Sequence, residues 1–240
     1  MSVVALIDHA VLHPTQTDDD LRAACAMCVE VGAASVCVKP SMAPLAAELL
    51  AGSRVVPSTV IGFPHGGTST GAKVRETEIA VAEGAKEVDM VVNLGRALAG
   101  DWTFVEADIR AVVEAARAGG AITKVIFETG LLPTDDLKIK LCEASERAGA
   151  AFVKTSTGFG MIKGEGGAMY ATGATEHDIA LMRAHCSERV QVKASGGIRS
   201  LADAQRFVAL GATRLGTSAT QVIADAERTG DAGATSQSSY

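Results

Sequence analysis

Short runs of apolar and β-branched residues alternate with longer helical segments along the chain. Eight such runs predict strands, and each is followed by a segment with helical spacing of its apolar residues. The repeating unit is therefore a strand followed by a helix. The predicted strands cover residues 7–11, 35–38, 55–61, 87–92, 123–127, 151–155, 190–194 and 213–216.

Capping residues mark the ends of the predicted helices. Thr17 precedes the first helix, and Ser200 with Asp203 resembles a capping box in which Asp replaces Glu. Glycine ends several helices and leads into the next strand, as a left-handed C-terminal cap does. The glycines in this position are Gly32, Gly84, Gly149 and Gly211.

Eight strand–helix units in 240 residues fit a single-domain α/β fold, the (β/α)8 or TIM barrel, whose usual length is ~250 residues. An open doubly wound sheet is the main alternative, and the first strand is not followed by the G-x-G-x-x-G turn typical of it. We expect the barrel to span residues 1–228. Residues 229–240 are small and polar, which predicts a flexible tail that ends at Tyr240.

The composition adds limits on function. With 48% hydrophobic and 21% charged residues, the chain has ample material for one globular core. A net charge of −6 without a basic block argues against a nucleic-acid partner, and no apolar run approaches the ~20 residues of a membrane span. Five cysteines and no leader sequence predict a reducing cytoplasm. Cys25 and Cys28 form a CxxC, which we interpret as a coincidence of one helix face.

Two apolar strands end in lysine, at the edge where a barrel places its chemistry. Lys154 lies in AFVKTSTGF (151–159), and Lys193 has the same place in QVKASGGIR (191–199). On adjacent strands, burial and the second ammonium would let each lysine lower the other's pKa. Moving that pKa from ~10.4 to near 7 requires ~4 to 5 kcal/mol, which only a buried site supplies. A neutral amine forms Schiff bases with carbonyls; the alternative is a lysine whose stem reaches solvent.

Asp89 interrupts an otherwise apolar strand, EVDMVVN (87–93). A buried carboxylate requires a partner, and a salt bridge to a lysine elsewhere in the barrel is one interpretation. The other is a group that transfers protons at the carbinolamine stage of Schiff-base formation. The two interpretations are compatible, and the residues alone do not separate them.

Two glycine-bearing loops follow the last two strands. Gly196 and Gly197 precede the helix that starts near Ser200, and Gly216 and Ser218 precede the final helix. Backbone N–H groups in these loops would point to one spot, and many barrels bind phosphate there. The alternative is that the glycines only permit tight turns.

Taken together, these segments resemble deoxyribose-phosphate aldolase, a family of class I aldolases, from Asp8 to Ser218. The matching motifs are DH (8–9), SVCV (35–38), TVIGFPHG (59–66), EVDMVVN (87–93), FVKTSTGF (152–159), VKASGGIR (192–199) and ATRLGTS (212–218).

The resemblance implies an enzyme without metal or other cofactor that cleaves 2-deoxy-D-ribose 5-phosphate to acetaldehyde and D-glyceraldehyde 3-phosphate. It implies that Lys154 forms the Schiff base, Lys193 perturbs its pKa and Asp89 transfers protons. Some relatives end in a tyrosine that swings into the barrel mouth and assists proton transfer, which implies this role for Tyr240. A homodimer is kept as a candidate assembly. The phosphate would be held by Gly158, Gly196, Gly197, Gly216 and Ser218.

The chain also departs from the family pattern. Ala10 replaces a frequent threonine, Lys39 replaces a residue that is commonly non-basic, and Ala219 replaces a frequent second serine. These changes affect the expected contacts to the sugar. The glycine-rich segment 160–173 is longer than usual, and it is either a lid over the site or an ordinary surface insertion.

Three other functions stay open at this point. A transaldolase or another Schiff-base sugar-phosphate aldolase would share the lysine but differ in substrate. A metal-dependent aldolase or isomerase would need ligands from the five histidines, which show neither HxH nor HExxH spacing. A non-catalytic barrel that binds sugar phosphates would have no need of the paired lysines.

Overall fold

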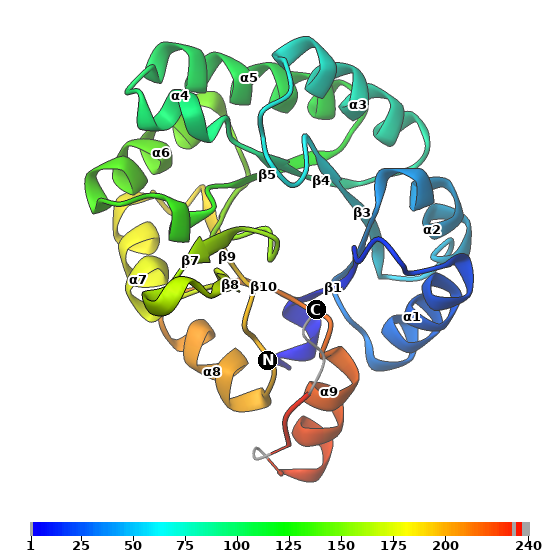
Figure 1. Cartoon of the computed structure of the whole chain (residues 1–240). Coiled ribbons are helices and arrows are strands. Elements are labelled where there is room, and N and C mark those ends of the chain that lie inside the picture. Colours follow the sequence, from blue (N-terminus) through cyan, green and yellow to red (C-terminus); the bar gives the residue numbers. More distant parts are fainter. Residues whose placement is uncertain (1, 232–233, 237–240) are drawn as a thin grey trace.

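Parallel strands close into a barrel in the computed structural model, which describes residues 2–231 and 234–236 (Figure 1). The order of hydrogen-bonded strands around the barrel is β1-β10-β9-β6-β5-β4-β3-β2. The predicted (β/α)8 fold is confirmed, and each strand boundary lies within one residue of its prediction. The barrel strands are β1 (Ile7–Val11), β2 (Ser35–Val38), β3 (Val56–Ile61), β4 (Glu87–Val91), β5 (Ile122–Ile126), β6 (Phe152–Lys154), β9 (Gln191–Ser195) and β10 (Arg214–Thr217).

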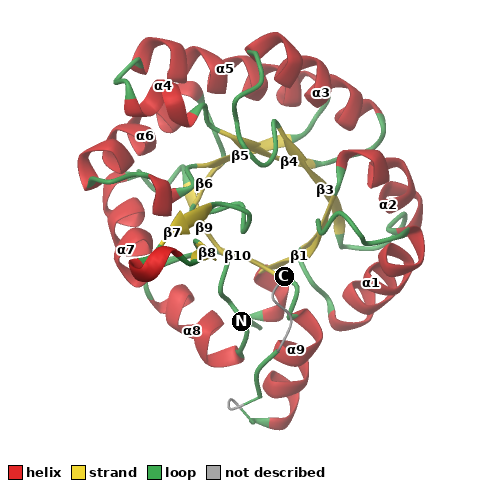
Figure 2. Ribbon diagram, in the orientation of Figure 1, coloured by secondary structure: helices red, strands yellow, loops and turns green. Residues whose placement is uncertain are grey.

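Helices cover the outside of the barrel (Figure 2). Within the described residues, none is both long and apolar enough to cross a membrane. The α-helices are α1 (Asp18–Val31), α2 (Ala43–Leu49), α3 (Thr70–Ala82), α4 (Leu94–Leu98), α5 (Trp102–Ala118), α6 (Asp135–Ala148), α7 (Glu176–His185), α8 (Leu201–Ala209) and α9 (Thr220–Thr229). Short 3-10 turns are η1 (Val4–Leu6), η2 (Pro40–Met42), η3 (Thr129–Leu131) and η4 (Glu165–Gly167).

The helix caps follow the predicted chemistry. Thr17 and Asp20 form a reciprocal capping box at the start of α1, and Ser200 and Asp203 form another at the start of α8. Gly32 ends α1 with φ of 78°, a left-handed conformation that glycine adopts without steric cost. Cys25 and Cys28 are buried on α1 among apolar neighbours, and burial raises the pKa of their thiols to about 11 and about 12.

The glycine-rich segment after β6 forms a β-hairpin rather than an irregular loop. Strand β7 (Met161–Lys163) pairs antiparallel with β8 (Met169–Ala171), and η4 connects them. The hairpin lies at the rim of the barrel, beside α7 (Figure 2). Its tip is exposed, with Met169 55% and Tyr170 52% accessible.

The last helix extends one residue beyond the predicted end of the barrel, to Thr229. In the described part of the tail, Thr235 forms an isolated antiparallel bridge with Ser200. The Ser236 N–H donates to the Arg199 carbonyl at 3.0 Å. Tyr240 lies outside the described residues, and both its role and the flexibility of the tail stay predictions.

A buried ion pair between α3 and α5 generates the first testable prediction. Lys73, fully buried, donates to Asp108 at 2.6 Å and to the Val91 carbonyl at 2.9 Å. We expect Asp108→Ala to lower the free energy of unfolding by about 3 to 5 kcal/mol, because it leaves a buried ammonium without its counter-charge. Urea unfolding measures this change.

The matched control is Glu78→Ala, which breaks the Arg75–Glu78 pair on α3. Those side chains are 71% and 50% exposed, so stability should change little. Equal losses in the two variants would contradict the importance assigned to burial.

Candidate active site

A network of charged side chains occupies the barrel interior. Parallel pairing sets Asp89 on β4 opposite Lys124 on β5, and Lys154 on β6 opposite Lys193 on β9. Adjacent strands lie ~4.8 Å apart, so these side chains meet inside the barrel. The network joins the carboxylates Asp8, Glu87 and Asp89 to the cations Lys124, Lys154, Lys193 and Arg214.

Asp89 is the centre of this network. Its Oδ1 accepts from Lys124 at 2.7 Å, and its Oδ2 accepts from both Lys154 and Lys193 at 2.8 Å. Burial alone would raise the pKa of this carboxyl, but the three ammonium groups outweigh burial and hold the pKa well below its usual range. Asp89 thus forms the salt bridges that one interpretation predicted. The same contacts place its Oδ2 next to Lys154 and Lys193, as the proton-transfer interpretation requires.

Lys154 is 3% exposed at the end of β6. Burial is the main cause that lowers the pKa of its ammonium below the ordinary value. Lys193 acts in the same direction, whereas Asp89 opposes it. The direction predicted for Lys154 agrees with its surroundings, because one carboxylate does not offset desolvation and a neighbouring positive charge.

The corresponding prediction for Lys193 is wrong. We expected the two lysines to lower each other's pKa, but the pKa of Lys193 is raised. Burial lowers it, and the attraction of Asp8 and Asp89 outweighs burial. Lys193 is therefore held in its protonated form by two carboxylates, whereas Lys154 has one carboxylate partner, and its pKa is lowered.

Sequence reasoning missed a second layer of ion pairs below Asp89. Lys124 contacts Glu87 at 2.6 Å, and Arg214 contacts Asp8 at 2.6 Å and Glu87 at 2.8 Å. The signal was present, since Lys124 interrupts the apolar run of β5 as Asp89 interrupts that of β4. The attraction of Asp8, Asp89 and Glu87 raises the pKa of Lys124 although burial opposes it.

The balance of charge in the network distinguishes Lys154 from the other cations. Three carboxylates face four cationic groups, so the fully ionised network carries one surplus positive charge. A buried surplus charge is unfavourable, and loss of one proton removes it. Lys154 is the cation in the network whose pKa is lowered, so it is the first of the four to lose its proton as pH rises.

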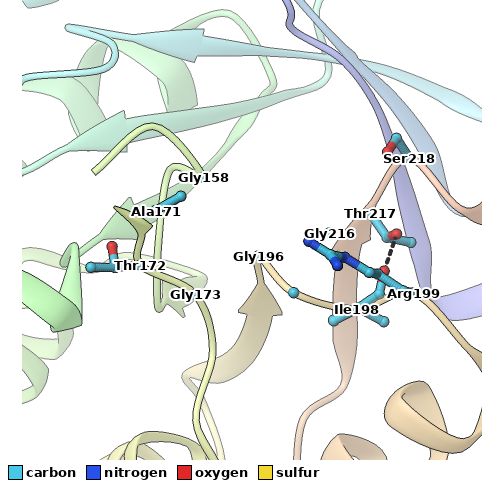
Figure 3. A pocket seen from close by; sticks show the side chains of 11 residues that line it. Gly158, Ala171, Thr172, Gly173, Gly196, Ile198, Arg199, Gly216, Thr217 and Ser218 are labelled. Carbon is cyan, nitrogen blue, oxygen red and sulfur yellow. Dashed lines mark hydrogen bonds between the residues drawn. The ribbon is translucent and has the colours of Figure 1, made fainter. Parts of the chain in front are cut away.

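A cavity of about 140 Å³ opens at the carboxyl edge of the barrel. Figure 3 shows the residues that line it. Four segments line the cavity, namely the loops after β6, β9 and β10 and the end of the β7–β8 hairpin. Gly216 connects the cavity to the lysines, because a Cβ there would lie 3.2 Å from Lys193 Cε. The five residues predicted to hold phosphate all lie around this cavity: Gly158, Gly196, Gly197, Gly216 and Ser218.

Further residues of the cavity wall were not predicted. Thr172 and Gly173, at the end of the β7–β8 hairpin, form one side, and the Arg199 side chain extends into the cavity from the β9–α8 loop (Figure 3). The motif VKASGGIR contains Arg199 two residues after Gly197, and this position is the sequence signal for a cation at the cavity. A guanidinium beside backbone N–H groups favours an anionic ligand.

One buried hydroxyl without a partner lies next to the cavity wall. Ser195 Oγ has no hydrogen-bond partner within the part of the chain that the structure describes. Ser195 lies two residues beyond Lys193 on β9. A Cβ on the cavity residue Gly216 would lie 2.2 Å from Ser195 Oγ, so glycine at position 216 leaves room for this hydroxyl.

The three residues that depart from the family pattern, Lys39, Ala10 and Ala219, lie in different surroundings: the lysine is hydrogen-bonded and the two alanines are buried. Lys39 donates to the Gln16 and Pro14 carbonyls at 2.7 and 3.3 Å, which ties it to the loop after β1. Ala10 and Ala219 are buried at the ends of β1 and β10.

Across residues 2–231 and 234–236, no three His, Cys, Asp or Glu side chains gather in a way that could hold a metal ion.

A buried lysine with a lowered pKa, set beside a glycine-lined cavity at the carboxyl edge of a (β/α)8 barrel, is typical of the class of Schiff-base-forming barrel enzymes. Comparison with known proteins is more specific. A family model described as DeoC/LacD family aldolase matches residues 2–221. The chain belongs to this aldolase family.

Relatives and solved structures agree with this membership. Deoxyribose-phosphate aldolases from Bacillus cytotoxicus and Bacillus mycoides are each 48% identical over 223 residues, which cover 93% of this chain and 95% of theirs. The tetrameric deoxyribose phosphate aldolase from Aeropyrum pernix superposes with a TM-score of 0.84 at 29% identity, covering 95% of this chain and 91% of that one. An aldolase called QR15 gives a TM-score of 0.86 at 33% identity, covering 95% and 97%.

The depressed pKa of Asp89 generates a prediction for acid stability. The ionised carboxylate stabilises the fold at pH values above its unfolded pKa of ~3.9, and this contribution is lost as pH falls towards the folded value. We expect the free energy of unfolding to decrease steeply below about pH 4. In Asp89→Asn, the free energy of unfolding should be lower at pH 7 and should depend less on pH below about pH 4. Urea unfolding between pH 2 and 7 measures both slopes, and equal slopes would contradict the prediction.

Proposed function

We propose that this protein is a class I, metal-independent lyase that reversibly cleaves 2-deoxy-D-ribose 5-phosphate to D-glyceraldehyde 3-phosphate and acetaldehyde. The observation that carries the proposal is Lys154, the one cation of the network with a lowered pKa, placed beside a glycine-lined cavity. The names of relatives that are 48% identical over 93% of the chain support the substrate.

In the proposed mechanism, the neutral Lys154 amine attacks C1 of the open-chain sugar. The carbinolamine takes up a proton on its hydroxyl and loses water to become an iminium, so the positive charge that the amine lacked arrives with that proton. Asp89 Oδ2 lies 2.8 Å from Lys154 Nζ and stabilises that charge. The same oxygen contacts Lys193 Nζ at 2.8 Å, so Asp89 and Lys193 can exchange the protons that carbinolamine formation and dehydration require.

Cleavage follows from the electron demand of the iminium. The C3 hydroxyl gives up its proton, the C2–C3 bond breaks, and its electron pair forms the enamine on C2. The fragment that leaves is D-glyceraldehyde 3-phosphate. Protonation of the enamine at C2 and addition of water then release acetaldehyde and regenerate the Lys154 amine.

The cavity accounts for the phosphate group in this proposal. The loops after β9 and β10 precede α8 and α9, and helix N-termini favour bound anions. Gly197 lies at the cavity with φ of 81°, which aims the backbone without a side chain in the way. Arg199 adds a charged donor that a phosphate can engage.

The setting of the enzyme is also part of the proposal. Its substrate is a small sugar phosphate, which suits the cytoplasm. A homodimer is the candidate assembly, and size-exclusion chromatography with light scattering distinguishes it from a tetramer such as the Aeropyrum pernix enzyme.

Borohydride trapping tests the proposed chemistry directly. Incubation with acetaldehyde followed by borohydride should add one ethyl group to Lys154, because reduction captures the iminium there. Peptide mapping by mass spectrometry locates the group. Lys154→Arg should abolish both trapping and turnover, since a guanidinium stays protonated and forms no imine.

The matched control is Lys163→Arg, which changes an exposed lysine on β7 and should leave trapping at Lys154 intact. Ethylation mainly at Lys39 or Lys193 would overturn the assignment of Lys154. Trapping at Lys154 with turnover of fructose 1,6-bisphosphate, but not of deoxyribose 5-phosphate, would replace the proposed substrate.

The pH–rate profile tests the role of Lys193. Lys193 lowers the pKa of Lys154 and shares Asp89 Oδ2 with it. In Lys193→Leu the pKa of Lys154 should rise, so the profile of kcat/KM should move to higher pH with a lower rate at neutrality. Lys86→Leu removes an exposed positive charge and should keep the wild-type profile. An unshifted profile in Lys193→Leu would rule out the proposed electrostatic role.

A further inference from the structure

Glu128 is a buried carboxylate that the proposed chemistry does not use. It follows β5 at the carboxyl edge of the barrel, and its side chain is 1% exposed. Among the described residues it is the only non-glycine with a positive φ, 54°. Left-handed backbone is unfavourable for a residue with a Cβ, so surrounding contacts must hold Glu128 in place.

Those contacts come from two different loops. The Thr157 N–H donates to Oε1 and Oε2 of Glu128 at 3.3 and 3.2 Å, and the Thr157 hydroxyl donates to Oε2. The Thr172 hydroxyl donates to Oε1 at 3.1 Å. Thr157 lies in the loop that follows Lys154, and Thr172 ends the β7–β8 hairpin. One carboxylate therefore joins the Schiff-base loop to the hairpin.

Thr172 is at the same time part of the cavity wall (Figure 3). Its N–H donates to the Gly160 carbonyl at 2.8 Å, which closes the base of the hairpin. Two residues on, the Ala174 N–H donates to the Gly196 carbonyl at 3.1 Å, in the loop after β9. The position of Thr172 therefore sets the distance between the hairpin side of the cavity and the loop that carries Gly196.

Glycines leave room for this arrangement. A Cβ on Gly160 would lie 2.5 Å from Glu128 Cδ, and a Cβ on Gly173 would lie 2.7 Å from the Gly196 carbonyl oxygen. Contacts this short require the neighbour to move. The Glu128 carboxylate is thus enclosed, and a single methyl group at position 160 would displace it.

We infer that Glu128 is a positioning residue, which holds Thr172 and the adjoining cavity wall where the phosphate of the substrate binds. This inference rests on the proposed function and adds a determinant of specificity for phosphorylated sugars. Glu128 acts through Thr172, since the carboxylate accepts the Thr172 hydroxyl proton. Loss of that hydrogen bond weakens phosphate binding and leaves imine formation at Lys154 unchanged.

Substitutions at Thr172 test the hydrogen bond itself. Thr172→Val keeps the shape but removes the hydroxyl, and it should raise KM for 2-deoxyribose 5-phosphate about tenfold, the effect of one hydrogen bond to a charged group. Its kcat/KM for unphosphorylated 2-deoxyribose should stay near the wild-type value. Thr172→Ser retains the hydroxyl and should restore a KM close to that of the wild type.

Gly160→Ala tests the carboxylate from the opposite side. The added methyl group displaces Glu128 without changing any cavity residue, so it should raise the same KM and spare the unphosphorylated sugar. Gly71→Ala is the matched control, because a Cβ at Gly71 in α3 meets no atom within 4 Å. It should leave both sugars unaffected.

Titration calorimetry with inorganic phosphate provides a readout without turnover. The wild type and Thr172→Ser should bind phosphate similarly, and Thr172→Val and Gly160→Ala about tenfold more weakly. Unchanged phosphate affinity in Thr172→Val would overturn the inference, as would equal losses on both sugars or a loss in Thr172→Ser as large as that in Thr172→Val. If the wild type binds phosphate but does not cleave 2-deoxyribose 5-phosphate, the proposed function fails, and the calorimetric comparison still decides the inference.

Discussion

The chemistry of this barrel depends on ion pairs that are shielded from water. Buried charges are tolerated when they are paired, and here three carboxylates face four cations. The network reaches neutrality when one cation loses its proton. Lys154 contributes a single described ion pair, to Asp89, whereas Lys193 and Lys124 each contact at least two carboxylates. Deprotonation therefore disturbs the network least at Lys154, and iminium formation returns the missing charge.

Closure of the barrel makes this network possible. Asp8 lies on β1 and Lys193 on β9, with β10 between them. The residue of β10 in register with Asp8 is Gly216, and a Cβ there would collide with Ser195 Oγ and approach Lys193 Cε. Glycine at this position leaves room for the Lys193 side chain to reach Asp8. Gly216, which lines the proposed phosphate cavity, thus also permits the Lys193–Asp8 ion pair that raises the pKa of Lys193.

Much of this architecture could be predicted from the sequence because it follows from local patterns. Apolar runs and glycine caps located the eight barrel strands, and a polar residue in an apolar strand identified Asp89, Lys154 and Lys193. The sign of the pKa shift at Lys193 could not be predicted in this way. It depends on Asp8, which is 185 positions away in the chain, and sequence spacing does not show which carboxylates converge on a lysine.

The β7–β8 hairpin was missed as an element for a related reason. Each of its strands has three residues in a glycine-rich segment, which is too short for a periodic signal. Its place in the structure is determined at its base, where Thr172 is 7% exposed and bonded to Glu128, and not at its tip, where Met169 is 55% exposed. An insertion held in this way can vary at the tip without altering the cavity. Changes at Gly160 or Thr172 act on the cavity directly, so selection for substrate should act on the base of the hairpin.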